Sequence, residues 1–188
     1  MYKKLTIITS IVLGLQGAAV QAETTHTTPH WDYTNNTTGP THWGDLSSDY
    51  APCKLGKRQS PIDITNTTKA QLTPLQFDYH SIPLVIENNG HTIKVHADNA
   101  GTLTIGKDSY KLVQFHVHAP SEEAINGKRA DLVIHLVHRS EKDQWAVVAV
   151  LFNASSQKNA ANPLLEAELK VLPPTPGKPQ TYKEVKID

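Results

Sequence analysis

The sequence has 188 residues, and its 18 lysines and arginines balance its 18 aspartates and glutamates, so the formal net charge is zero. This balance excludes the global positive field that draws proteins to nucleic acid or acidic lipid, and it favours a small neutral substrate. The chain beyond residue 22 has the length of one ordinary domain, which can bury a core without disulfides or structural metals.

The first 22 residues are expected to form a signal peptide. Lys3 and Lys4 give a positive start, residues 5–20 form an apolar run, and residues 20–22 form a small-residue cleavage site. Glycine and glutamine interrupt the run, which makes it a poor membrane-spanning helix, although an uncleaved anchor is the alternative. We therefore expect a mature chain that begins near Glu23, is exported to the periplasm or secreted, and has no membrane contact after cleavage.

The rest of the chain is mainly β in pattern. Residues 23–41 are rich in Thr, Asn, His and Pro and predict an irregular arm. Segments rich in β-branched and aromatic residues, separated by turn residues, then predict seven strands: 75–79, 84–88, 91–97, 101–105, 110–119, 132–138 and 145–152. The last is continuously apolar, which predicts a central strand covered on both faces.

The remaining segments add little regular structure. Leucine spacing over residues 162–172 predicts one helix, with Asn162 and Pro163 as its start signal. The proline-rich end of the chain predicts a connector with one short extended piece. We expect one mainly β domain over residues 23–188.

The cysteine count is unusual for an exported protein. Cysteines usually pair in oxidising compartments, yet Cys53 is the one cysteine in the sequence. It is free, or joined to another chain, or its partner has been lost.

Three histidines have the spacing of a metal site. His116 and His118 are two residues apart in a predicted strand, so their side chains project from the same face, about 6 to 7 Å apart along the backbone. His135, in the next predicted strand, is the candidate third ligand because the connection suits an antiparallel return. Three histidines leave one position open on a tetrahedral zinc ion, which is the pattern of a catalytic rather than a structural site.

The spacing alone does not prove a metal site, because a bare His-x-His pattern is more often structural. His138 lies on the opposite face of its strand by parity and is predicted to be a hydrogen-bonded core histidine. The other histidines are interpreted as surface or structural residues: His26, His30, His42, His80 and His96.

The sequence motifs around these histidines, and others over nearly the whole mature chain, resemble those of the alpha-class carbonic anhydrases. Six motifs occur in the family's order: HWDY (30–33), GPTHWGDL (39–46), RQSPIDI (58–64), NNGH (88–91), QFHVHAPSE (114–122) and IHLVH (134–138). The resemblance implies the carbonic anhydrase fold, a central twisted mixed but largely antiparallel sheet with a few short peripheral helices.

The resemblance also implies a reaction. His116, His118 and His135 would bind Zn2+, and a zinc-bound hydroxide would attack carbon dioxide to give bicarbonate. Zinc lowers the pKa of its water to about 7, a value established for carbonic anhydrases themselves. Carbon dioxide and bicarbonate would then be the small-molecule partners, with sulfonamides or anions as inhibitors.

Further residues acquire roles through the same resemblance. His91 matches the family's proton shuttle, which agrees with an exposed imidazole that exchanges protons near neutral pH, although a solvated turn histidine is the alternative. Tyr33 and Asn89 match residues that order the connecting waters, although Lys94 stands where relatives often have an amide. Glu122 matches the gatekeeping carboxylate.

The last matches concern the surroundings of the zinc ion. Gln114 matches the residue that orients one zinc histidine through a hydrogen bond. Val137 and Val147 match the apolar lining of the carbon dioxide pocket, and each could equally be plain core.

Besides Lys94, the sequence departs from the family in two places. The family usually has a glutamate two residues before the third histidine, where this chain has Val133, and loss of such a partner typically costs about 10 to 100-fold in metal affinity or activity. Asp131 has the same strand parity and is a candidate substitute.

The family's later segment SLTTPPC has no counterpart before Asp188, so we expect a shortened carbonic anhydrase without the threonine that Glu122 should hold. The cysteine expected to pair with Cys53 is in that segment. An uncovered edge or core surface then predicts poor solubility or a homodimer.

The sequence leaves three candidate functions for this chain. The first is an exported zinc lyase that hydrates carbon dioxide reversibly. The second is a catalytically weak or inactive carbonic anhydrase-related protein, given Val133 and the missing threonine. The third is an exported zinc-storage protein, which would bind several ions per chain.

Overall fold

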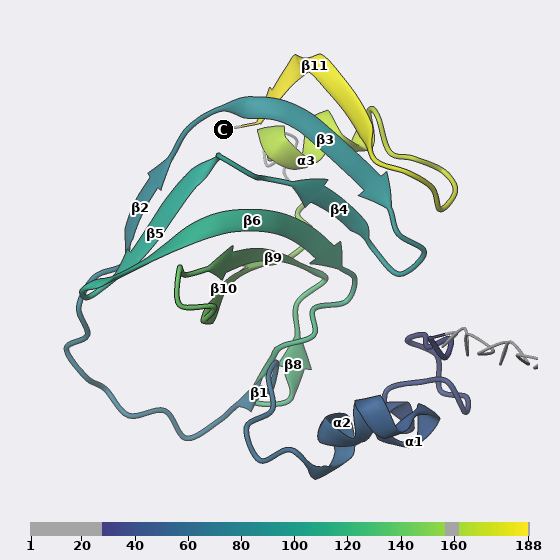
Figure 1. Cartoon of the computed structure of the whole chain (residues 1–188). Helices are drawn as coiled ribbons and strands as arrows, with labels where there is room; N and C mark the ends of the chain where they lie inside the picture. Colours follow the sequence, from purple (N-terminus) through teal and green to yellow (C-terminus); the bar gives the residue numbers. More distant parts are fainter. Residues whose placement is uncertain (1–27, 157–161, 188) are drawn as a thin grey trace, which may run out of the picture.

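The computed structural model describes residues 28–156 and 162–187 (Figure 1). The expected signal peptide and His26 lie outside these residues. Within the described ranges, no helix has the length and apolar character needed to cross a membrane.

A twisted sheet of eight strands forms the body of the protein (Figure 1). Six strands follow the order β10-β9-β6-β4-β3-β11, while β5 pairs with both β6 and β2, and every pairing is antiparallel. The bounds are β2 Gln76–Tyr79, β3 Ile82–Asn88, β4 Ile93–His96, β5 Gly101–Ile105, β6 Asp108–His118, β9 Leu132–Arg139, β10 Trp145–Phe152 and β11 Gln180–Ile187. All seven predicted strands and the final extended piece are confirmed.

Smaller elements lie outside this sheet. A second sheet has the order β1-β7-β8, with β1 and β7 parallel, and its bounds are β1 Asp63–Ile64, β7 Ala124–Ile125 and β8 Lys128–Arg129. The helices are short: α1 Trp43–Leu46, η1 Ser48–Tyr50, α2 Ala51–Leu55 and α3 Pro163–Leu169. The predicted helix is confirmed as α3, in a shorter form. Asn162 accepts a hydrogen bond from the backbone N–H of Leu165 at its start.

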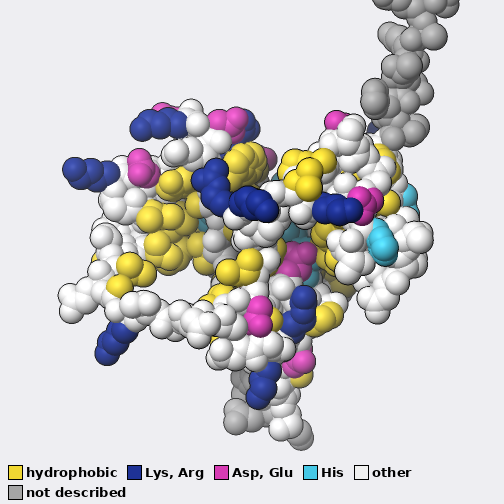
Figure 2. Space-filling view, turned by 90° about the horizontal axis from the view of Figure 1, so that it is seen from below, with side chains coloured by type: hydrophobic (Ala, Val, Ile, Leu, Met, Phe, Trp, Pro, Cys, Tyr) yellow, Lys and Arg dark blue, Asp and Glu magenta, His cyan; other side chains and the backbone are white. Residues whose placement is uncertain are grey.

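The prediction that residues 145–152 form a central strand is wrong. Among the described residues β10 pairs with β9 alone, so it is an edge strand. Trp145 and Val147 are 58% and 54% exposed. Figure 2 views the molecule from below and shows apolar side chains exposed on that side of the molecule. A continuous apolar run is typical of a covered strand, but the pattern carries no information on how many neighbours the strand has.

A bulge in β6 changes the face of the sheet to which alternate side chains of this strand point. Leu112 pairs with His138 and Gln114 with Val137, so one extra residue lies between these two pairs. The bulge reverses the alternation, and therefore Leu112 lies in the buried core while Gln114 faces the opposite side with His116.

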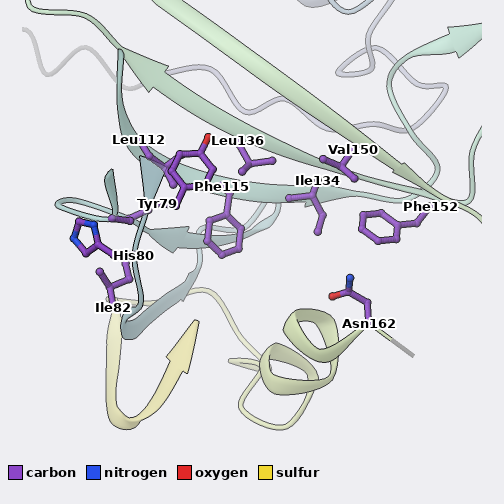
Figure 3. A pocket seen from close by; sticks show the side chains of 12 residues that line it. Tyr79, His80, Ile82, Leu112, Phe115, Ile134, Leu136, Val150, Phe152 and Asn162 are labelled. Carbon is purple, nitrogen blue, oxygen red and sulfur yellow. The ribbon is translucent and has the colours of Figure 1, made fainter. Parts of the chain in front are cut away.

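The main hydrophobic cluster of the described residues lies on one face of the sheet. Its buried members include Leu84, Ile86, Val95, Phe115 and Ile134, with Leu165 of α3 packed against them. Apolar side chains on this face also line a cavity of about 230 Å³, and α3 lies across from them in Figure 3. The other face carries the polar side chains described next.

Candidate functional site

Three histidines meet on the polar face of β6 and β9. His116 is the direct partner of His135 in the antiparallel register, and His118 is two residues along β6. One ring nitrogen from each of the three lies within 4.8 Å of the others. The predicted convergence of these three side chains is therefore present, and the separation of the nitrogens is small enough for one metal ion to bind all three.

His116 is oriented by its neighbour on β6. Its Nδ1 donates a hydrogen bond to Oε1 of Gln114 over 2.9 Å, which leaves Nε2 without a proton. The pKa of His116 is lowered to about 4, mainly by burial, with the nearby histidines and Lys94 acting in the same direction. The ring is neutral at pH 7, as a metal ligand requires.

His118 has a free nitrogen. Its Nε2 is buried and has no hydrogen-bond partner within the described part of the chain, although Oε2 of Glu122 lies 3.3 Å away. Burial lowers the pKa of His118, and the Glu122 carboxylate opposes this shift. A buried nitrogen without a partner is costly in a folded protein, so this atom fits a metal ligand.

Glu122 joins the cluster to the N-terminal arm. The hydroxyl of Tyr33 donates to Oε1 of Glu122 over 2.9 Å, while Oε2 faces His118 and lies 3.7 Å from Nδ1 of His135. Burial raises the pKa of Tyr33, and the hydrogen bond to the carboxylate adds to the effect. The phenol therefore stays protonated and remains a donor.

The partner of His135 was not predicted. Its Nε2 lies 2.7 Å from Oε1 of Glu123, a residue outside the strand. Asp131, the candidate substitute, accepts instead a hydrogen bond from the backbone N–H of Ala154, so that prediction is wrong. Val133 is fully buried in β9 and offers no acceptor. Two adjacent glutamates in the sequence were the available signal, but nothing in the pattern says which one reaches His135.

A cleft of about 360 Å³ opens onto the cluster. His116, His118 and Glu122 line it, together with Gln114, Lys94, Thr92 and the residues of the rim: Trp31, Tyr33, Asn89 and His91. Figure 2 shows acidic and histidine side chains in a hollow near the middle of the face seen from below.

His91 lies at the rim of the cleft and is exposed to solvent. Its imidazole stacks on the indole of Trp31 with centroids 3.8 Å apart and planes inclined by 4°, and the ring of His30 lies 6.1 Å from it. Asn89 shapes the turn, because its Oδ1 accepts from the backbone N–H groups of His91 and Thr92 at 2.9 Å each. His91 therefore has the position, at the mouth of the cleft, that a proton carrier needs.

Lys94 belongs to an ion cluster beside the site. Its Nζ lies 2.6 Å from Oε1 of Glu87, and Nε2 of His96 lies 3.1 Å from the other oxygen. The hydrogen bond from Lys94 is the main reason that the pKa of Glu87 is lowered. Lys94 is thus both part of the cleft wall and held in place.

The other predicted residues lie outside this cleft. Val137 and Val147 are paired with each other on the face that carries His135, but neither is among the residues that line the cleft. Their role in binding carbon dioxide stays a prediction. Cys53 is a free, exposed thiol in α2. His138 is fully buried and hydrogen-bonded to Tyr79, so the prediction of a core histidine is confirmed.

Comparisons with known proteins agree with this arrangement. The family model of eukaryotic-type carbonic anhydrases matches residues 38–187. A carbonic anhydrase of Pectobacterium carotovorum is 42% identical over 77% of this chain and 57% of its own length. One of Neisseria gonorrhoeae is 38% identical over 89% of this chain and 64% of its own. The chain thus spans about three fifths of the curated relatives it matches.

A solved structure gives the same result. The alpha-carbonic anhydrase from Thermovibrio ammonificans, in complex with the inhibitor sulfanilamide, superimposes with a TM-score of 0.77 and 40% identity, over 86% of this chain and 70% of that one. On the family match and these relatives together, this chain belongs to the alpha-class, eukaryotic-type carbonic anhydrases.

Proposed function

We propose that this chain is a zinc lyase that catalyses the reversible hydration of carbon dioxide to bicarbonate and a proton. The observation that carries the proposal is the group of three ring nitrogens within 4.8 Å, since two of the three histidines, His116 and His118, also line a cleft. Membership of the carbonic anhydrase family supports the reaction.

The donor set fits zinc. His116, His118 and His135 would hold the ion, since hydrogen bonds to Gln114 and Glu123 occupy the opposite nitrogens of two rings and the Nε2 of His118 has no partner among described residues. When bound, zinc acts as a Lewis acid that lowers the pKa of water to about 7, the value known for carbonic anhydrases, and so supplies a nucleophile at neutral pH.

The residues around the histidines would direct this chemistry. Glu122 faces the cluster with one oxygen and accepts a hydrogen bond from the Tyr33 hydroxyl with the other, so the oxygen that faces the cluster is fixed relative to the histidines. It is suited to accept a hydrogen bond from the reacting water and thereby orient it. Lys94, paired with Glu87, adds positive charge to the wall that bicarbonate passes.

Each turnover releases a proton, and His91 would carry it to solvent. It lines the same cleft as His116 and His118, and its ring is near the arm residue Trp31. An imidazole can accept and release protons near neutral pH, which suits a relay between the cluster and buffer. Asn89 fixes the turn that carries this ring, and with Tyr33 it is proposed to order the connecting waters.

The competing functions gain no specific support. The described residues contain a single group of three or more potential metal ligands, whereas zinc storage would call for several. Weak or absent activity was the alternative suggested by Val133 and the missing threonine. For Val133, a carboxylate of Glu123 lies beside His135 instead. Sulfonamides are proposed as inhibitors, because the relative from Thermovibrio ammonificans is described in complex with sulfanilamide.

The direct test is stopped-flow hydration of carbon dioxide with the full chain loaded with zinc. We expect one zinc ion per chain, turnover above the buffer background, and inhibition by sulfanilamide. A folded, zinc-loaded sample without turnover would rule out the enzyme function.

Export and self-association are part of the proposal and have separate tests. The mass of the protein recovered after expression would show whether residues 1–22 are removed. Light scattering would show whether chains associate through the exposed edge of β10, as its apolar side chains suggest.

A further inference from the structure

The buried contact between His135 and Glu123 is the feature of the site with most consequence for metal binding. Nε2 of His135 and Oε1 of Glu123 are 2.7 Å apart, and their side chains are 6% and 13% exposed. A hydrogen bond of this length to a carboxylate, shielded from water, is among the stronger kinds in proteins. It occupies Nε2, whereas Nδ1 of His135 and Nε2 of His118 both lie near Oε2 of Glu122, at 3.7 Å and 3.3 Å.

We infer that Glu123 is a positioning residue for the zinc ion, a role that rests on the proposed function. If Nε2 carries the proton and donates it to Glu123, the lone pair of His135 is on Nδ1. That atom is on the side of the ring that faces Glu122, 3.7 Å from its Oε2. Glu123 thus selects the tautomer and the ring orientation that leave Nδ1 available to the metal.

Among the described residues, no other carboxylate is placed to do this. Val133 projects from the same face of β9 as His135, but it is a buried hydrocarbon without an acceptor. Asp131 is occupied by the backbone of Ala154 at 2.7 Å. Glu122, the remaining carboxylate beside His135 among described residues, accepts from Tyr33 and faces the opposite ring nitrogen.

The segment that carries Glu123 is fixed on its N-terminal side. Ser121 is fully buried, and its hydroxyl donates to the carbonyl of Glu123 over 2.7 Å and accepts from the backbone N–H of Ala130 over 2.9 Å. Arg129 donates to the carbonyl of Ser121 over 2.6 Å. These bonds tie the segment to the chain just before β9, which carries His135.

It is also fixed on its C-terminal side. Ala124 follows directly and begins β7, where it pairs with Asp63 of β1. The second oxygen of Glu123 is buried and has no hydrogen-bond partner within the described residues, so no competing donor draws the carboxylate away from the imidazole. Glu123 is therefore preorganised, as an orienting residue must be.

Two variants and one matched control test the inference by zinc affinity. Glu123→Ala removes the acceptor, and we expect its affinity for zinc, measured by competition with a chromophoric chelator, to fall about 10 to 100-fold. Glu123→Gln keeps an acceptor oxygen without the charge and should lose less. Asp131→Asn changes the other nearby carboxylate and should bind zinc as the unmodified chain does.

A second readout concerns the zinc-free protein. We expect nitrogen-15 NMR to show His135 with its proton on Nε2, and to show loss of that signature in Glu123→Ala but retention in Asp131→Asn. Glu123→Ala combined with Val133→Glu should recover part of the zinc affinity, because a strand carboxylate two residues before His135 can reach the same nitrogen. Recovery would separate positioning from a merely structural effect of residue 123.

Three results would overturn the inference. They are unchanged zinc affinity in folded Glu123→Ala and Glu123→Gln, an equal loss in Asp131→Asn, or a proton on Nδ1 of His135. If Glu123→Ala does not fold, Glu123→Gln and the NMR of the unmodified chain decide. A chain that binds zinc with the expected dependence on Glu123, yet does not hydrate carbon dioxide, would refute the proposed function and leave this inference standing.

Discussion

His135 and His138 are three residues apart on β9 and are both buried, with 4% and 0% of their surfaces exposed. They face opposite sides of the sheet. The ring of His135 lies 5.3 Å and 5.0 Å from those of His116 and His118, and it is flanked by carboxylates. The ring of His138 is surrounded by the core and contacts the hydroxyl of Tyr79 at 2.6 Å.

Burial therefore does not distinguish a metal ligand from a core histidine. The hydrogen-bond partners of the two ring nitrogens do. Both nitrogens of His138 have partners, namely Tyr79 and the carbonyl of Ala146 at 3.3 Å. In the cluster, Gln114 and Glu123 each occupy one nitrogen and leave the other beside its neighbours. A buried histidine with both nitrogens occupied stabilises the fold, and one with a free nitrogen beside two others can bind metal.

Replacing His135 or His138 separately by glutamine should give the largest difference in zinc affinity. His135→Gln should weaken zinc binding by more than about 100-fold, since loss of an outer partner alone costs about 10 to 100-fold. His138→Gln should leave zinc affinity within about twofold, because it acts on the other face. Chelator competition measures both, and equal losses in the two variants would refute the distinction.

The next effect concerns the rim of the cleft. His91→Ala should slow carbon dioxide hydration by about 100-fold in weak buffer, at the lower end of the range for a positioned acid or base. Added imidazole should restore much of the rate by carrying the proton instead. Stopped-flow assays check this, with His30→Ala as control, since His30 is a neighbouring imidazole but does not line the cleft. Failure of rescue would argue against a shuttle.

Much of the fold and the cluster could be predicted because both follow from local sequence patterns. Segments rich in β-branched and aromatic residues, bounded by turn residues, located each long strand. Parity placed His116 and His118 on one face and His138 on the other. Parity does not predict how many neighbours a strand has, so β10 was placed in the centre when it is an edge. The bulge after Leu112 has no sequence signal strong enough to predict it.

The rest could not be predicted because it depends on contacts between distant segments. The short helix α1 is fixed by Trp43, whose indole N–H contacts the carbonyls of Asp32 and Thr38 in the arm. Glu123 reaches His135 because Ser121 and Arg129 shape a connection with no periodic pattern. Strand parity predicted Asp131 as the partner of His135, whereas the geometry of the connection places Glu123 there.

A smaller effect is expected on stability at the core histidine. His138→Leu leaves the hydroxyl of Tyr79 without its partner, and we expect a loss of about 2 to 3 kcal/mol in the free energy of unfolding. Adding Tyr79→Phe should recover part of that loss, because both polar groups are then removed. Urea unfolding of the unmodified chain and of the two variants measures it, and equal stability of the single and double variants would show that this hydrogen bond contributes little.

The smallest effect extends the comparison to carboxyl groups. Glu87 on the polar face has Lys94 as a donor, whereas Glu168 of α3 is 4% exposed and its Oε1 has no hydrogen-bond partner among described residues. Burial raises the pKa of Glu168 from 4.5 to about 7. The folded state therefore binds more protons than the unfolded state between these values, so this group's contribution to stability is full below pH 4.5 and falls as the pH rises to 7.

Glu168→Gln should remove that pH dependence. We expect the variant to be more stable than the unmodified chain by about 1 to 2 kcal/mol at pH 8, with the difference shrinking toward pH 4.5. Urea unfolding across this range measures the difference, and Glu166→Gln, on the exposed side of the same helix, is the matched control. If the difference in unfolding free energy between the variant and the unmodified chain does not vary with pH, Glu168 is ionised in the folded protein. The Glu168 carboxylate would then be tolerated on the apolar face without a hydrogen-bond donor.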